Sequence, residues 1–213
     1  MVALVLALAP SNAAEGSDVE PCPVWDIEYA LSGKLQLSDT PLNAGNGVYP
    51  VGPGTLVLRF DRREGHPQVA LVSYRMPERF RVDAKWAFWT THVTTNATTR
   101  ATPPGPCGHV AEGAMHGNTL TWTTGTQGYR TDGTLSCNGS LCGSHGAPPR
   151  GTSPLHVGPT SVRLRPFEFS PDGKTFTMAS TFVSKTESPK QTAHLTLAGR
   201  QVRRSCARVD ACR

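Results

Sequence analysis

The residues whose types and spacing most directly suggest chemistry are six cysteines: Cys22, Cys107, Cys137, Cys142, Cys206 and Cys212. An even number of cysteines favours disulfides formed in an oxidising compartment. Residues 138–141 are typical of a turn, so we expect Cys137 to pair with Cys142. Cys206 and Cys212 are near neighbours and form the second expected pair, which leaves Cys22 for Cys107. A bond between Cys22 and Cys206, joining the two ends of the chain, is the alternative.

The same thiols allow two competing interpretations. A four-thiolate zinc site would combine Cys137 and Cys142 with Cys206 and Cys212. Zinc ribbons favour two to four residues between paired ligands, however, and the second pair here encloses five. Cys142 also lies three residues before His145, which sets a thiol near an imidazole, as in cysteine nucleophiles. An even cysteine set in an oxidising compartment favours disulfides over both.

Histidines and carboxylates form no recognisable catalytic or metal-binding motif. His109, Glu112 and His116 lie close together, but zinc metalloproteases place two histidines at i and i+4 on a helix, and this interval is seven. His92 has the same parity as the apolar residues of segment 80–88, so we expect it in the core or at a strand edge. The Gly-x-Ser-x-Gly and P-loop motifs are both absent from the sequence. We therefore expect no catalytic residue, no metal and no cofactor.

Tryptophan supplies the one candidate ligand-binding residue. The four tryptophans all fall in segments that we expect to be strands, and most share the parity of core positions. Trp89 falls on the polar side of its segment instead, which indicates either a bulge near Ala87–Phe88 or an exposed ring. An exposed indole is a stacking platform for a sugar or another flat ligand, so Trp89 is the predicted binding residue.

Segments of alternating polarity must position these residues. From residue 25 to residue 37 every odd position is apolar or glycine, which predicts a half-buried strand with a bend at Ser32–Gly33. No window of eleven residues has a convincing helical period. Similar patterns predict further strands at residues 56–60, 69–74, 80–88, 91–99, 119–124, 161–169, 175–183 and 193–197.

Turn residues separate these segments. Ser170–Lys174 contains Pro-Asp-Gly and predicts a tight hairpin. Two stretches crowded with Gly and Pro, residues 39–54 and 142–159, are expected to be long loops. The fold class is therefore all-β: a single-domain antiparallel β-sandwich or β-barrel with long Gly/Pro-rich loops and little or no helix.

The two ends of the chain have compositions of their own. Residues 2–9 are uninterruptedly apolar and precede Pro10 and the small pair Ala13-Ala14, which predicts a cleaved export signal at residues 1–14 and a secreted or periplasmic protein. That stretch is too short to span a bilayer, so we expect no membrane span. The all-β domain then covers residues 15–199, and residues 200–213 form a basic tail that contains two cysteines.

The charge of the chain is concentrated in that tail. The formal net charge is +5, and residues 200–213 carry five arginines against one aspartate. The body is therefore close to neutral, so a nucleic-acid partner is not expected. The composition is typical of a GC-rich bacterial coding sequence, because Arg, Ala, Gly and Pro are abundant and Lys and Ile are scarce.

These features favour a non-enzymatic binding or structural module that is exported and stabilised by disulfides. The residues do not identify its partner; a glycan and a small apolar ligand are the two candidates. The alternatives are a carrier that holds a small ligand inside a barrel, as lipocalins do, and a carboxylate-dependent hydrolase such as a glycosidase. An apolar cavity of several hundred Å³ would favour the carrier, and two facing carboxylates about 5–9.5 Å apart would favour the hydrolase.

Overall fold

The chain forms eleven antiparallel strands within the residues that the computed structural model describes, which are 22–38, 46–66, 68–86, 89–101, 110–124, 126–144, 147–183 and 192–207. The strands are β1 (Val24–Ser38), β2 (Gly47–Asp61), β3 (Val69–Trp86), β4 (Trp89–Ala101), β5 (Ala111–His116), β6 (Thr119–Trp122), β7 (Thr126–Gly139), β8 (Gly151–Arg163), β9 (Phe167–Phe169), β10 (Thr175–Val183) and β11 (Thr192–Cys206). The described residues contain no helix that could cross a lipid bilayer.

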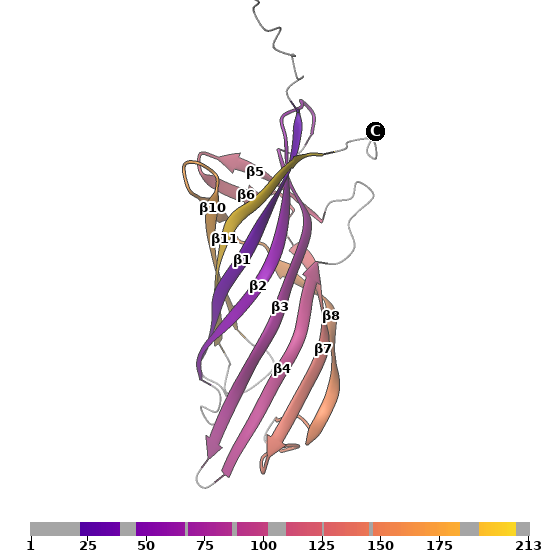
Figure 1. Ribbon diagram of the computed structural model, residues 1–213, viewed down its shortest axis with the longest axis vertical. Coiled ribbons are helices and arrows are strands. Elements are labelled where there is room, and N and C mark those ends of the chain that lie inside the picture. The colour runs from indigo at the N-terminus through magenta and orange to yellow at the C-terminus, as the bar shows by residue number, and fades with distance from the viewer. Residues whose placement is uncertain are drawn as a thin grey trace, which may run out of the picture.

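Eight of these strands close into a barrel. They follow one another around the ring in the order β2-β1-β11-β10-β9-β6-β5-β3, and pairing of β2 with β3 completes it. Three strands, β4, β7 and β8, continue the sheet outward from β3 (Figure 1). The predicted all-β antiparallel fold is therefore confirmed, and of the two predicted architectures it is the barrel.

Strand β3 belongs to both parts of the sheet because it is 18 residues long. Its first residues pair with β2 and β5, whereas Arg75–Trp86 pairs with β4. We call residues 75–86 of β3 together with β4, β7 and β8 the extension. The sequence predicted two separate strands here, because the intervening Arg75-Met-Pro-Glu-Arg79 does not read as a half-buried strand. Residues 75–86, including Glu78, nevertheless follow one continuous register against β4.

The hydrophobic core is formed by inward-facing side chains of the barrel strands. Tyr29, Leu56 and Leu58 are at most 2% exposed, as the period-2 pattern predicted. Aromatic rings pack beside them: Phe176 lies edge-on to Tyr29 at 5.2 Å and is stacked on Phe167 at 4.7 Å. Burial of each such side chain stabilises the fold by roughly 1.5–3 kcal/mol. The register of β1 against β2 shifts between Leu31 and Gly33, at the bend that the sequence predicted.

Two disulfides are formed, Cys22–Cys206 and Cys137–Cys142. The second is the turn-spanning pair that the sequence predicted. The expected Cys206–Cys212 and Cys22–Cys107 pairs are wrong and the alternative Cys22–Cys206 is right, because β1 and β11 are antiparallel neighbours with Cys206 opposite Trp25. These bonds also exclude the four-thiolate zinc site and indicate an oxidising, extracytoplasmic environment.

Both segments that we expected to be long loops contain strands. Residues 47–54 belong to β2, and residues 151–159 belong to β8. Gly and Pro indicated loops in both places, but β8 is the last strand of the sheet, and an edge strand tolerates proline because one of its edges needs no N–H donor. The hairpin at Ser170–Lys174 is confirmed: it joins β9 to β10, and Gly173 has a φ of 68°.

Part of the predicted tail belongs to the barrel. β11 continues to Cys206, so Arg200, Arg203 and Arg204 lie on a strand. The predicted signal at residues 1–14, together with Cys107, His109, His145 and Cys212, lies outside the described residues.

Candidate functional site: a cavity inside the barrel

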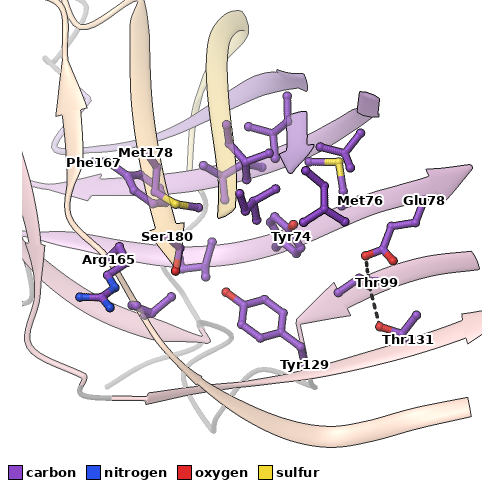
Figure 2. A pocket seen from close by; sticks show the side chains of 18 of the residues that line it. Tyr74, Met76, Glu78, Thr99, Tyr129, Thr131, Arg165, Phe167, Met178 and Ser180 are labelled. Carbon is purple, nitrogen blue, oxygen red and sulfur yellow. Dashed lines mark hydrogen bonds between the residues drawn. The ribbon is translucent and has the colours of Figure 1, made fainter. Parts of the chain in front are cut away.

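A cavity of about 340 Å³ is lined by core residues of the barrel on one side and by residues of the extension on the other. We call it the barrel cavity. Figure 2 shows many of the side chains around it. Its lining consists of Leu31, Leu35, Val51, Leu56, Leu71, Tyr74, Met76, Glu78, Thr99, Tyr129, Thr131, Val157, Leu164, Arg165, Phe167, Phe176, Met178, Ser180, Leu195 and Leu197.

Most of this lining is apolar, because the strands of the barrel alternate. Leu35 on β1, Met178 on β10 and Leu195 on β11 are inward-facing residues that pack against the core cluster while remaining partly exposed. Apolar side chains that no other side chain covers are what a ligand cavity requires. The volume lies at the lower end of the roughly 300–1,000 Å³ range of small-molecule sites.

Two tyrosines line the cavity: Tyr74 of β3, just before the extension, and Tyr129 of β7, within it. In the register, Arg75 on β3 lies opposite Arg100 on β4, and the next residue of β4, Ala101, lies opposite Tyr129 on β7. The small Ala101 therefore separates Tyr74 from Tyr129, and their rings meet edge to face with centroids 5.4 Å apart. The two rings form one wall of the cavity.

A directed chain of hydrogen bonds lies next to these rings. The hydroxyl of Thr99 donates to the Oε1 atom of Glu78 at 2.6 Å, and the hydroxyls of Thr99 and Thr131 are 2.6 Å apart. Because Thr99 has only one hydroxyl proton and gives it to Glu78, Thr131 must donate to Thr99. Figure 2 shows this group at one side of the cavity. The chain holds the Glu78 carboxylate in place on an otherwise apolar face.

Three other hydroxyls in the lining have no hydrogen-bond partner among the residues that the structure describes. They belong to Tyr74, Tyr129 and Ser180, and no described residue bonds to any of them. Ser180 is only 8% exposed. Burial raises the pKa of Tyr129 to about 12, and burial, with Tyr129 and Glu78 nearby, raises the pKa of Tyr74 above its usual range. Both phenols therefore stay protonated near neutral pH and can donate. A buried polar group without a partner costs free energy, which a bound acceptor would recover.

Arg165 brings a positive charge to the same cavity. It lies between β8 and β9, where its carbonyl oxygen accepts a hydrogen bond from Nε1 of Trp122 at 3.0 Å. Trp122 also packs edge-on against Phe167 at 5.3 Å, so the backbone of this segment is held in place. The guanidinium of Arg165 has no ion-pair partner among the described residues, and the residue is exposed.

Two strands that do not pair with each other among the described residues both line the cavity. Val157, which is 46% exposed, lies on β8, and Met178 lies on β10. Within the described chain β8 pairs with β7, and β10 pairs with β9 through Phe176 and Thr177.

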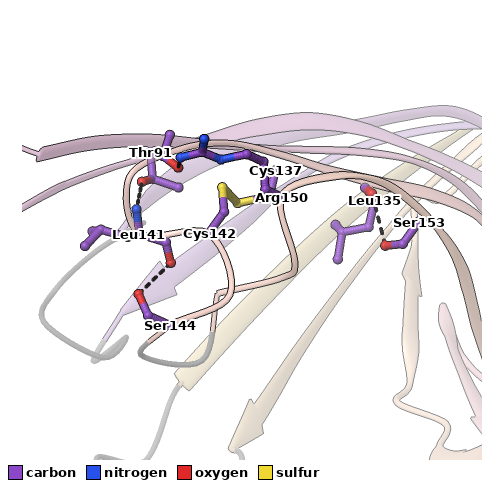
Figure 3. The surroundings of a disulfide bond; sticks show 9 residues. Thr91, Leu135, Cys137, Leu141, Cys142, Ser144, Arg150 and Ser153 are labelled. Carbon is purple, nitrogen blue, oxygen red and sulfur yellow. Dashed lines mark hydrogen bonds between the residues drawn. A yellow bond between two sulfur atoms is a disulfide. The ribbon is translucent and has the colours of Figure 1, made fainter.

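The far end of the extension is covered by the loop that follows β7. The Cys137–Cys142 disulfide turns the chain back, and the amide of Leu141 donates to the hydroxyl of Thr91 at 3.0 Å (Figure 3). Thr91 is 1% exposed, and Leu141 is 9% exposed. Apolar surface on the inner face of β4 is thereby covered.

A second recess lies at the opposite end of the barrel, among Trp25, Ile27, Phe60 and the β2–β3 hairpin. It contains two carboxylates, Asp61 and Glu64. Arg63 binds Asp61 through two nitrogens, and this hydrogen bonding lowers the pKa of Asp61. A carboxylate held ionised in this way is unsuited to act as a general acid.

The residues singled out in the sequence lie apart from the barrel cavity. Trp89 is 51% exposed at the start of β4, as expected, and belongs to neither recess; its role in binding stays a prediction. His92 was expected in the core or at an edge. It lies instead on the polar face, because the register places it opposite Asp83, whose carboxylate it contacts at 2.6 Å. The disulfide of Cys142 excludes it as a nucleophile.

The described residues hold no group of three or more His, Cys, Asp and Glu side chains suited to a metal ion. Glu112 and His116 lie on β5, away from both recesses. The polarity pattern of the sequence did not identify Tyr129 and Thr131 as cavity residues, because it did not predict β7, the strand on which they lie. No family model, curated protein or solved structure matches this chain.

Proposed function

We propose that this protein is an exported binding protein that holds a small, largely apolar molecule in the barrel cavity. The observation that carries the proposal is the cavity itself, with about 340 Å³ of space, a mostly apolar lining and a few convergent polar groups. The disulfide-bonded barrel is consistent with a binding module. Export agrees with the disulfides and with the apolar segment at residues 2–9.

The geometry gives the hydrolase alternative less support. Glycosidases need two carboxylates across the scissile bond. Glu78 is the one carboxylate among the described residues of the cavity lining. In the second recess, Asp61 is bound by Arg63. Binding without catalysis is therefore the function that these side chains support best.

A fluorescence titration tests the proposal. N-phenyl-1-naphthylamine, a neutral dye that brightens in apolar surroundings, is added to the full protein and to two variants. Leu195→Trp places a larger side chain into the cavity, and Val202→Trp places the same side chain on an exposed position of the same strand.

The expected result is saturable binding by the wild type and by Val202→Trp, and at least about tenfold weaker binding by Leu195→Trp, which corresponds to about 1.4 kcal/mol. Thermal unfolding of each variant shows that it is folded. Equal binding by all three folded proteins would place the dye outside the barrel and overturn the proposal.

A further inference from the structure

We infer that the ligand of the barrel cavity is an apolar molecule with a single oxyanion, such as a carboxylate, which Arg165 binds together with the hydroxyls of Ser180 and Tyr129. This inference rests on the proposed function and adds the chemical class of the ligand and its orientation. It depends on which polar groups of the lining lack partners.

The unpartnered groups are hydrogen-bond donors and a cation. Ser180 is buried and its hydroxyl bonds to no described residue, and the Tyr129 phenol stays protonated because burial raises its pKa. Arg165 contributes a guanidinium with no ion-pair partner among the described residues. Charge-assisted hydrogen bonds between such donors and a carboxylate are shorter and stronger than neutral ones.

These groups lie on one side of the cavity. In Figure 2, Ser180 and Arg165 lie opposite Glu78, and the hydroxyl of Tyr129 points away from Thr131 toward them. Glu78 already accepts a hydrogen bond from Thr99. The two sides therefore differ in charge, and an anion is attracted to the Arg165 side and repelled from the Glu78 side.

The apolar remainder of the ligand fits the rest of the lining. With the anion at the exposed Arg165 and at Ser180, the apolar chain lies against Leu195, which is opposite Ser180 in the register. Leu35 and Met178 extend this apolar surface. The charged end then stays close to water while the apolar part is buried, which is the arrangement of lowest desolvation cost.

The experiment compares three probes with the same chain: dodecanoic acid, dodecylamine and dodecanol. Each displaces N-phenyl-1-naphthylamine from the wild type and from the Arg165→Gln, Glu78→Gln and Arg79→Gln variants, below the concentration at which the probe forms micelles. Arg79 is the matched control, because it is an exposed arginine of β3 next to Glu78, and neighbouring strand residues face opposite sides.

The expected order of affinity is acid, then alcohol, then amine. Arg165→Gln weakens binding of the acid about tenfold and leaves binding of the alcohol unchanged, whereas Glu78→Gln does not weaken binding of the acid. Arg79→Gln leaves all three affinities unchanged.

Two results overturn the inference and distinguish it from the proposed function. If the alcohol and the amine bind as tightly as the acid, or if Arg165→Gln has no effect on the acid, the oxyanion is wrong but the apolar cavity stands. If the wild type binds neither the dye nor any of the three probes, the proposed function fails as well.

Discussion

Removing the Cys22–Cys206 disulfide is expected to destabilise the fold far more than removing Cys137–Cys142. A disulfide lowers the conformational entropy of the unfolded chain, and the effect grows with the length of the loop that it closes. Cys22–Cys206 joins residues 184 positions apart, and Cys137–Cys142 joins residues 5 positions apart. The chain-entropy relation then gives about 5 kcal/mol for the first and about 2 kcal/mol for the second.

The assay is urea unfolding of two double variants, Cys22→Ser with Cys206→Ser, and Cys137→Ser with Cys142→Ser. Both are made in a background in which Cys107 and Cys212 are serine, so that no new pair can form. With a slope of about 2.5 kcal/mol per M, the midpoints fall by roughly 2 M and 0.8 M from that of the background.

A larger loss from the short-range pair would refute this reasoning. It would mean that the Cys137–Cys142 bond acts through the native state, by holding Leu141 against Thr91, rather than through the unfolded chain.

Three further predictions concern the packing of the fold. Thr91→Val leaves the buried amide of Leu141 without an acceptor and should lower the free energy of unfolding by about 1–3 kcal/mol. The control Thr90→Val changes an exposed residue and should lower it by less than about 0.5 kcal/mol. Urea unfolding measures both. Gly199→Ala would set a methyl group 2.1 Å from the ring of Phe176. The free energy of unfolding of this variant should fall by roughly 1–3 kcal/mol, and its thermal midpoint should fall with it. An unchanged midpoint would contradict the packing. Burial raises the pKa of Tyr29 to about 12. Between pH 10 and 12 the folded state therefore keeps the phenol proton, whereas the unfolded state releases it. The stability that the protonated Tyr29 contributes to the fold is present below pH 10 and is lost as the pH rises toward 12. Urea unfolding at pH 9 and pH 11.5 checks this, and Tyr29→Phe should lose less stability over that interval than the wild type does.

Local patterns predicted many of the strands and their buried side chains, but not which strands pair with each other. Tyr29, Leu56 and Leu58 alternate with polar residues, so the sequence alone identified them as buried. Closure of the barrel depends on β2 pairing with β3 and on β1 pairing with β11, and the second contact joins residues more than 150 positions apart. No local pattern encodes such pairing, which explains why the Cys22–Cys206 bond remained only an alternative.

The candidate site was hidden for a related reason. Glu78 and Pro77 interrupt the apolar alternation of β3, so the segment did not read as a strand, although this interruption is what brings a carboxylate into the cavity. Tyr74 and Tyr129 are 55 positions apart and meet only because β4 lies between β3 and β7. Trp89 attracted attention because it breaks a local pattern, whereas the cavity residues depend on the register of distant strands.

The most direct test of the account is a crystal structure of the protein grown with dodecanoic acid. The account predicts density for the probe inside the barrel, with the chain between Met178 and Leu195 and the carboxylate within hydrogen-bond distance of Arg165 and Ser180. Density outside the barrel, for example in the recess beside Trp25, or a barrel cavity filled by rearranged side chains, would contradict it.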